Sequence, residues 1–282
     1  MTRQVLFKGA PVTLAGRKIE VGMAASGFRV VSQNLEEVRL SDFKGKIKVV
    51  NSFPSLDTPV CDLQVKEFNK SSAGLSGDLV ILGISKDLPF AQKRFCEAFE
   101  IKNVKVLSDY KTSSFGINYG LLIKELNLLA RAALIIDKND ILRYAQIAEE
   151  LTHPLNYEEI LNKLGEVIGN PVLPAKEGLP SRCKPCEGEI AALPEETVKK
   201  LSEKYRGWEL VEGRKLVKVF EFKDFIDCKY FLDIISVIAE EQGHHPTMTI
   251  SYNKLRITLT THAAKGLTEN DFIMAGIIEM LM

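Results

Sequence analysis

The chain has 282 residues, of which 45% are hydrophobic and 26% charged, enough for two ordinary cores. Basic and acidic residues are equal in number at 37 each, so no basic surface indicates a nucleic acid or an anionic membrane as a partner. The N-terminus lacks the apolar core of a signal peptide, and no apolar run reaches transmembrane length. Five cysteines suit a reducing compartment better than a disulfide framework, so we expect a cytoplasmic protein.

Apolar strand-like runs alternate with helical stretches in the first 169 residues. The expected strands are 47–53, 79–84, 104–107 and 132–136, and the expected helices are 60–70, 89–99 and 157–168. Strands that alternate with helices in this way predict a layered α/β sheet.

One cysteine in this half is placed at the start of a predicted helix. Thr58 is suited to cap the helix and Pro59 to open it, so Cys61 would lie in the first turn. The positive end of the helix dipole and free backbone N–H groups stabilise a thiolate there, and lower the pKa of cysteine from about 8.5. Each part alone has an ordinary explanation, because threonine is a common cap and free cysteine is usually a small buried hydrophobic residue.

The run from Pro54 through Thr58 to Cys61 resembles the active-site pattern of the peroxiredoxins, and Gln64 adds a likeness to the thiol peroxidase subfamily. The resemblance covers about residues 5–169. It implies an α/β thioredoxin-like fold, with Cys61 as the thiol that attacks the peroxide and with Pro54 and Thr58 at the substrate.

The same resemblance assigns two more positions. Cys96 matches the resolving cysteine, which forms a disulfide with Cys61 after oxidation. Arg131 matches the arginine that neutralises the thiolate and orients the peroxide. By sequence alone, Cys96 could equally be a core residue and Arg131 a surface charge.

The composition changes between residues 169 and 194, where five of the eleven prolines lie. We therefore predict a stiff linker at 170–193, between a first domain at 1–169 and a second at 194–282. Cys183 and Cys186 form a CxxC within it. The pair could exchange disulfides with the first domain, supply half of an intermolecular metal site, or be structural; zinc within this chain would need two further ligands, and there is no second CxxC.

After the linker, the predicted order is helix 195–205, strands 208–212 and 215–222, helix 224–241, a hairpin and a terminal helix. In the second helix Cys228 lies on an apolar face, so we expect it in the core. The hairpin strands, 247–252 and 255–262, are predicted to flank a turn at Asn253-Lys254. This register would pair Tyr252 with Leu255 and, at the open end, His245 with His262.

Three of the four histidines lie within this hairpin region, which suggests proton transfer or metal binding. The run His244-His245-Pro246, with Glu240 before it and His262 and Asp271 after it, resembles the signature of pterin-4a-carbinolamine dehydratase. The resemblance covers about residues 193–282. It implies an α+β domain with an antiparallel sheet packed against helices.

In that family the histidines line the pterin pocket, so His244, His245 and His262 would bind substrate and move protons. Glu240, Pro246 and Asp271 would help to bind it. Asp271 has an alternative explanation, because residues 268–271 before an apolar run also form an ordinary helix capping arrangement. A zinc site is the rival use of three histidines, but the adjacent His244 and His245 point in different directions and the family is metal-free.

The sequence thus predicts a bifunctional enzyme that reduces peroxides and dehydrates 4a-hydroxytetrahydropterin without a bound cofactor or metal. We expect a thioredoxin-like reductant as a partner, small-molecule substrates, and a homo-oligomer that is a dimer or a tetramer. The alternative is a peroxidase whose C-terminal domain is a non-catalytic module for oligomerisation or partner docking.

Overall fold

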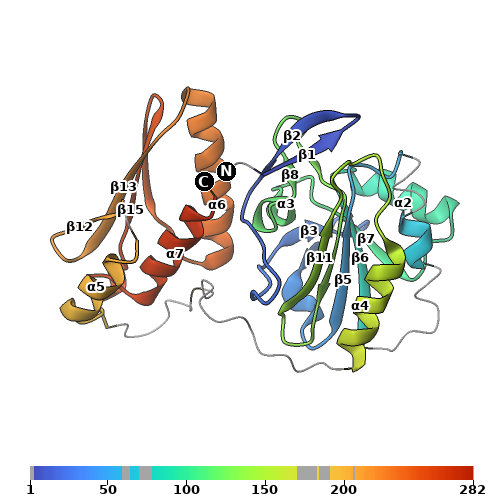
Figure 1. Ribbon diagram of the computed structural model, residues 1–282, viewed down its shortest axis with the longest axis horizontal. Coiled ribbons are helices and arrows are strands. Elements are labelled where there is room, and N and C mark those ends of the chain that lie inside the picture. The colour runs from blue at the N-terminus through green and yellow to red at the C-terminus, as the bar shows by residue number, and fades with distance from the viewer. Residues whose placement is uncertain are drawn as a thin grey trace. The chain divides into compact units, whose positions relative to one another are not determined.

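A computed structural model describes residues 3–58, 64–69, 78–169, 183, 191–205 and 207–281 (Figure 1). The chain divides into two compact units, Met1–Leu179 and Pro180–Met282. Each unit has its own sheet and is described by itself.

A seven-stranded sheet forms the centre of the first unit, in the order β11-β10-β5-β6-β7-β3-β4. β5, β6 and β7 are parallel neighbours, and β10 runs antiparallel to β5. The strands are β3 (Arg29–Val31), β4 (Glu37–Arg39), β5 (Ile47–Ser52), β6 (Leu79–Ser85), β7 (Val104–Ser108), β10 (Ala132–Ile136) and β11 (Leu142–Ile147). All four strands expected from apolar runs are therefore present, which confirms the α/β prediction.

Helices lie along this sheet (Figure 1): α2 (Pro89–Ala98) beside β7, α3 (Ser114–Asn118) beside β3, and α4 (Tyr157–Gly169) beside β10 and β11. Residues 64–69 are helical and fall within the helix expected at 60–70, whose other residues lie outside the described part. A short 3-10 helix, η1 (Leu40–Phe43), precedes β5. A smaller sheet in the order β1-β2-β8-β9 consists of Arg3–Phe7, Ala10–Ala15, Leu122–Ile123 and Leu128–Leu129.

β5 is the strand that leads into the Thr58 turn, and all six of its residues are buried. Three of them, Ile47, Val49 and Val50, are apolar, as expected for a strand covered on both faces. The charged residue of this strand is Lys48, whose side chain is 0% exposed and forms an ion pair with Asp140. A buried ammonium group is tolerated only when it is paired and hydrogen-bonded, so Asp140 is what allows a lysine at this position.

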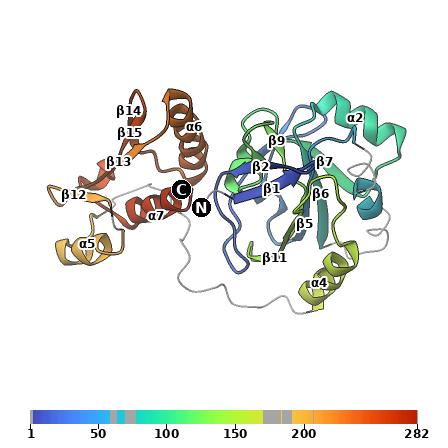
Figure 2. The ribbon, with the colours of Figure 1, turned by 45° about the horizontal axis from the view of Figure 1, so that its top comes forward.

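The second unit is an antiparallel sheet in the order β12-β13-β15-β14 with helices on one face (Figure 2). Its elements are α5 (Glu195–Ser202), β12 (Glu209–Val211), β13 (Lys215–Glu221), α6 (Phe225–Gln242), β14 (Thr247–Ser251), β15 (Lys254–Leu259), η2 (His262–Ala264) and α7 (Glu269–Glu279). This order confirms the predicted α+β domain.

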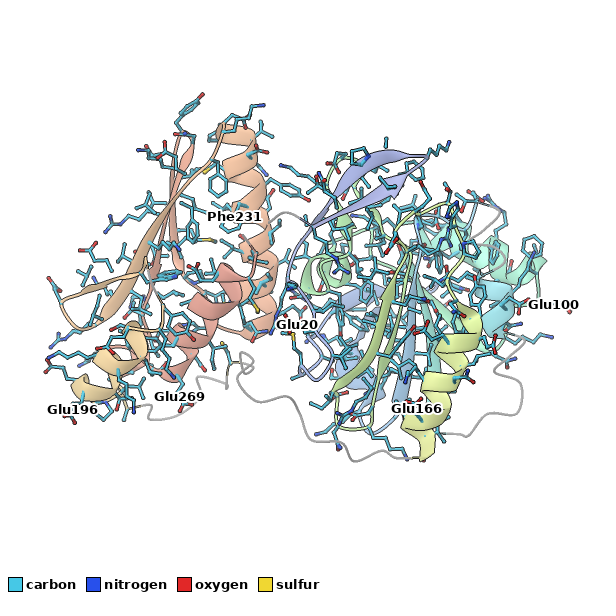
Figure 3. The ribbon with its side chains drawn as sticks, in the orientation of Figure 1. Glu20, Glu100, Glu166, Glu196, Phe231 and Glu269 are labelled. Atoms are coloured by element: carbon cyan, nitrogen blue, oxygen red, sulfur yellow. The ribbon has the colours of Figure 1, made fainter. Side chains whose placement is uncertain are left out.

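The core of this unit lies between the sheet and α6 and α7. Leu255, Ile257 and Leu259 of β15 are 0% exposed, whereas the alternating residues face outward. Phe231 of α6 points toward the sheet and packs against Phe220 with ring centroids 5.3 Å apart (Figure 3). Cys228 is also 0% exposed, as predicted from the apolar face of its helix.

The predicted register of the histidine hairpin is wrong by two residues. Ser251 pairs with Lys254 and Ile250 with Leu255, so the turn is at Tyr252-Asn253 rather than Asn253-Lys254. Tyr252 takes a φ of 50°, the left-handed conformation that a two-residue hairpin turn needs. β15 ends at Leu259 and His262 opens η2, so His245 and His262 do not pair as strand partners.

The Lys48–Asp140 pair predicts different effects on stability for substitutions of its two members. Asp140→Ala leaves an unpaired buried ammonium and should destabilise the first unit by about 3 kcal/mol, whereas Lys48→Met removes the charge and should be neutral or stabilising. Hydrogen exchange of the β5 amides in increasing urea measures this. Equal destabilisation by both variants would contradict the assignment.

Candidate active sites

The segment that follows β5, up to Thr58, carries the described residues of the first predicted site. Pro54 is buried and Thr58 is half-buried. The Thr58 hydroxyl donates to the Ser55 carbonyl at 3.2 Å, and the Thr58 backbone N–H donates to the same oxygen at 3.3 Å. Pro59 and Cys61 lie outside the described residues, so the predicted cap and the helix-start cysteine remain predictions.

Arg131 lies in the interior, not on the surface. Its side chain is 1% exposed, and it sits between β9 and β10, next to the strand that pairs with β5. Nη1 donates to Gln64 Oε1 at 2.7 Å, and Nε donates to the Leu151 carbonyl at 3.0 Å. Gln64 is also fully buried, and it follows Cys61 by three residues. The structure therefore joins the resemblance-derived arginine to the segment that carries the predicted reactive cysteine.

Cys96 lies in α2, two residues from its end, and is 9% exposed. Burial raises the pKa of its thiol, and a hydrogen bond from the Gln33 side-chain amide, 3.2 Å from Sγ, acts in the opposite direction. Among the described residues Cys96 is a free cysteine. The reduced form therefore keeps this sulfur as a covered thiol.

The second site is organised around a buried histidine–aspartate pair. His244 Nε2 lies 2.8 Å from Asp271 Oδ1, and their side chains are 6% and 0% exposed. His244 follows Gly243, whose φ of 63° ends α6 in the left-handed conformation that glycine adopts easily. The end of α6 and the start of α7 thus place the two side chains against each other.

The other oxygen of Asp271 collects donors from two further segments. Oδ2 accepts the Thr261 hydroxyl at 2.8 Å and the Thr268 backbone N–H at 2.8 Å. The bond to Thr268 is the capping interaction expected at the start of α7. Asp271 therefore caps the helix with one oxygen and holds His244 with the other, so the two explanations of this residue are compatible.

His245 and His262 are both exposed. His245 Nε2 lies 3.1 Å from Glu240 Oε2, one turn back at the end of α6. His262 directly follows Thr261, which is bonded to Asp271. The three predicted histidines thus belong to segments that meet at Asp271, with His244 inside and the other two at the surface. Pro246, between His245 and β14, is half-buried.

Cys183 forms hydrogen bonds with residues close in sequence to both members of the His244–Asp271 pair. Its backbone N–H donates to Gln242 Oε1 at 3.0 Å, and its thiol donates to the Asn270 carbonyl at 3.7 Å. Gln242 precedes His244 by two residues, and Asn270 directly precedes Asp271. Cys183 is buried, and Cys186 lies outside the described residues.

Sequence patterns did not point to two polar partners, Gln33 at Cys96 and Gln242 at Cys183. Only their three-dimensional neighbours distinguish them. Within the described residues, no cluster of three or more His, Cys, Asp or Glu side chains has a geometry suited to a metal ion. No helix in the described part is long and apolar enough to cross a membrane.

Both halves of the chain match known protein families. Residues 20–161 match the redoxin family. The thiol peroxidase of Bacillus subtilis is 46% identical over 156 residues, which cover 55% of this chain and 93% of that protein. The chain belongs to the redoxin family. A solved peroxiredoxin-like protein from Aquifex aeolicus is 43% identical, with a TM-score of 0.56 over 59% of this chain and 98% of that one.

The thioredoxin-like fold extends to more distant redoxins. The thiol peroxidase from Chromobacterium violaceum is 18% identical, with a TM-score of 0.53, over 59% of this chain and 97% of that one. Residues 191–281 match the pterin 4 alpha carbinolamine dehydratase family. This redoxin is therefore an enzyme in which a thiol peroxidase-like region is followed by a dehydratase-family region, which confirms the predicted fusion.

The burial of Cys96 predicts an order of thiol reactivity. With limiting iodoacetamide at pH 7, Cys61 should be alkylated well before Cys96, because alkylation needs the thiolate and burial raises the pKa of Cys96. Peptide mass spectrometry of the reduced protein measures the order. Faster labelling of Cys96 would contradict this view of its environment.

Proposed function

We propose that this chain is a bifunctional enzyme, a thiol-dependent peroxidase in its first unit and a 4a-hydroxytetrahydropterin dehydratase in its second. The observation that carries the first activity is the buried Arg131 bonded to Gln64, three residues after Cys61. The observation that carries the second is the buried His244–Asp271 pair within the dehydratase-family region.

In the peroxidase reaction the Cys61 thiolate attacks one oxygen of a hydroperoxide, ROOH. A sulfur–oxygen bond forms and the O–O bond breaks, and the peroxide proton moves to the leaving oxygen, so that ROH departs. Cys61 is left as a sulfenate, which takes a proton from water to become a sulfenic acid. Because Thr58 donates its own hydroxyl hydrogen to Ser55, its oxygen lone pairs can accept the peroxide O–H. Arg131 then stabilises the charge that develops on the leaving oxygen.

Stabilisation of the transition state must contribute more to the rate of peroxide reduction than formation of the thiolate does. A thiol of pKa about 8.5 is already a few per cent ionised at pH 7, so complete ionisation raises the thiolate fraction only about thirtyfold, or about 2 kcal/mol. Enzymes typically accelerate reactions about a millionfold or more. Donors held in a water-poor interior, as Arg131 is, supply stabilisation of the remaining size.

Resolution follows when the Cys96 thiolate attacks the Cys61 sulfenic acid, which gives a disulfide and water. A disulfide needs Cα atoms within about 7 Å, and Cys96 is covered within α2, so we expect the end of α2 to unwind. Unwinding also exposes the thiol and removes the burial that raises its pKa. A thioredoxin-like dithiol in a reducing, cytoplasmic setting would then restore both thiols.

In the dehydratase reaction the 4a hydroxyl leaves as water while the ring nitrogen N5 loses a proton. His244 is suited to proton transfer because Asp271 holds its Nε2, which leaves Nδ1 as the nitrogen that exchanges protons with the substrate. His245, bonded to Glu240, and His262 lie at the surface and would bind the pterin and relay protons. Pro246 would shape the same pocket.

Separate cysteine variants test the peroxidase assignment. Cys61→Ser should abolish peroxide reduction and leave pterin dehydration near the wild-type rate, because no other cysteine has its predicted position. Cys228→Ser is the matched control, since Cys228 is a buried core thiol and should leave peroxide reduction intact. Peroxidase activity that survives in Cys61→Ser would refute the assignment.

Variants of the buried pair test the dehydratase assignment against the docking-module alternative. His244→Ala should lower kcat for carbinolamine dehydration by about 10²–10⁴, the usual contribution of a general acid or base. Asp271→Asn keeps an oxygen that can accept the hydrogen bond of the helix cap but removes the carboxylate, so it should lower kcat by a smaller factor. A wild-type protein that does not dehydrate a carbinolamine would favour the docking module.

A further inference from the structure

A carboxylate outside the predicted site residues connects the segments that carry both peroxidase cysteines. Asp87 follows β6, and it directly precedes Leu88, which occupies the N-cap position of α2. Its Oδ1 accepts the Ser55 hydroxyl at 2.7 Å, and its Oδ2 accepts the Leu56 backbone N–H at 2.8 Å. The carboxylate therefore holds the turn before Cys61 against the base of the helix that contains Cys96.

Ser55 connects the Asp87 carboxylate to Thr58, the residue predicted to contact the peroxide. Its carbonyl accepts both the backbone N–H and the hydroxyl of Thr58, at 3.3 and 3.2 Å, and its hydroxyl oxygen accepts the Asp57 N–H at 3.2 Å. Ser55 accepts both hydrogen bonds from Thr58, so a displacement of Ser55 would also displace Thr58.

The other side of Asp87 is attached to the central sheet. Ser85, at the end of β6, donates its hydroxyl to Asp87 Oδ2 at 2.7 Å and accepts from the Gln92 side chain at 3.0 Å. Gln92 lies in the first half of α2, is 0% exposed, and also donates to the Leu107 carbonyl in β7 at 2.8 Å. Two parallel strands thus fix the carboxylate and the start of α2 together.

We propose that Asp87 is a positioning residue that holds Thr58 at the peroxide and anchors the start of α2, while the other end of α2 unwinds to bring Cys96 to Cys61. The inference rests on the proposed peroxidase function. Its physical basis is that reacting groups must be held closely, since a displacement of about 1 Å can cost about 10²-fold in rate. Loss of the carboxylate also leaves the N–H of the buried Leu56 without this acceptor.

The hydrogen-bond geometry predicts different results for two substitutions at this position. Asp87→Ala removes both carboxylate oxygens and should slow the reaction of Cys61 with peroxide at least tenfold. Asp87→Asn can keep its oxygen at Leu56 and Ser85 and donate its amide to Ser55, whose hydroxyl can rotate and accept. Asn should therefore retain most of the rate.

Two serine variants provide a matched pair that leaves Asp87 in place. Ser55→Ala removes one bond to Asp87 and should slow Cys61 oxidation by several-fold. Ser32→Ala is the control. Like Ser55, Ser32 is half-buried, and its hydroxyl oxygen accepts the backbone N–H of the residue two positions later, Asn34, at 3.2 Å. Ser32 lies in the connection between β3 and β4 and should not affect Cys61 oxidation.

Single-turnover experiments with one equivalent of hydrogen peroxide measure the formation of the Cys61 sulfenic acid and of the Cys61–Cys96 disulfide separately. We expect the rate constant for sulfenic acid formation to be highest in Asp87→Asn, lower in Ser55→Ala and lowest in Asp87→Ala. The rate of carbinolamine dehydration should be unchanged in all three. An Asp87→Ala rate constant for sulfenic acid formation equal to the wild type overturns the proposal. If Asp87→Ala does not fold, equal rates for Ser55→Ala and Ser32→Ala overturn it. A wild-type chain in which peroxide does not oxidise Cys61 is a different result, because it rejects the proposed function itself.

Discussion

Each candidate site depends on a charged side chain that is almost completely removed from water. Arg131 is 1% exposed and Asp271 is 0% exposed. A buried charge is costly unless hydrogen bonds replace its hydration, so the surrounding segments are arranged to supply them. Arg131 joins the β9–β10 connection to Gln64 and Leu151, and Asp271 joins the ends of α6 and β15 to the start of α7.

The sign of each buried charge agrees with the chemistry proposed beside it. Peroxide reduction proceeds from a thiolate to a developing anion on the leaving oxygen, and a guanidinium favours both. In the proposed dehydratase reaction His244 transfers protons, and the carboxylate of Asp271 lies 2.8 Å from its Nε2. Because Arg131 and Asp271 are themselves buried, their interactions are stronger than they would be at the surface.

The course of the chain was largely predictable from local pattern. β10 and the starts of β5, β6, β7, α2 and α4 agree with the apolar runs, because a buried strand or an amphipathic helix leaves a direct trace in the sequence. The hairpin register could not be predicted from such a pattern. A shift of two residues keeps the same side chains on the same face of the sheet, so alternation alone cannot distinguish Tyr252-Asn253 from Asn253-Lys254 as the turn.

Burial of charged side chains was the feature that local pattern could not supply. Arg131 is one of 37 basic residues, and nothing next to it in sequence shows that Gln64 will accept its hydrogen bond. Lys48 is the same kind of case, since its partner Asp140 is 92 residues away. Family resemblance located Arg131, whereas Lys48 and Asp87 became visible only through their neighbours in space.

Asp271 shows why competing interpretations of one residue need not exclude each other. A carboxylate has two oxygens with separate lone pairs, and here Oδ2 serves the helix start while Oδ1 serves His244. The cap fixes the carboxylate in the orientation that the histidine needs, so helix stability and site geometry depend on the same side chain.

Cys183 extends this dependence to the segment before the dehydratase-family region. Its backbone and its thiol are bonded to Gln242 and to the carbonyl of Asn270, beside the two members of the buried pair. A residue with these contacts supports the positions of His244 and Asp271 whether or not it ever forms a disulfide. Among the three interpretations of the CxxC, these contacts favour the structural one for Cys183, because a buried thiol that donates to a carbonyl is poorly placed to ligate a metal or to exchange with another disulfide.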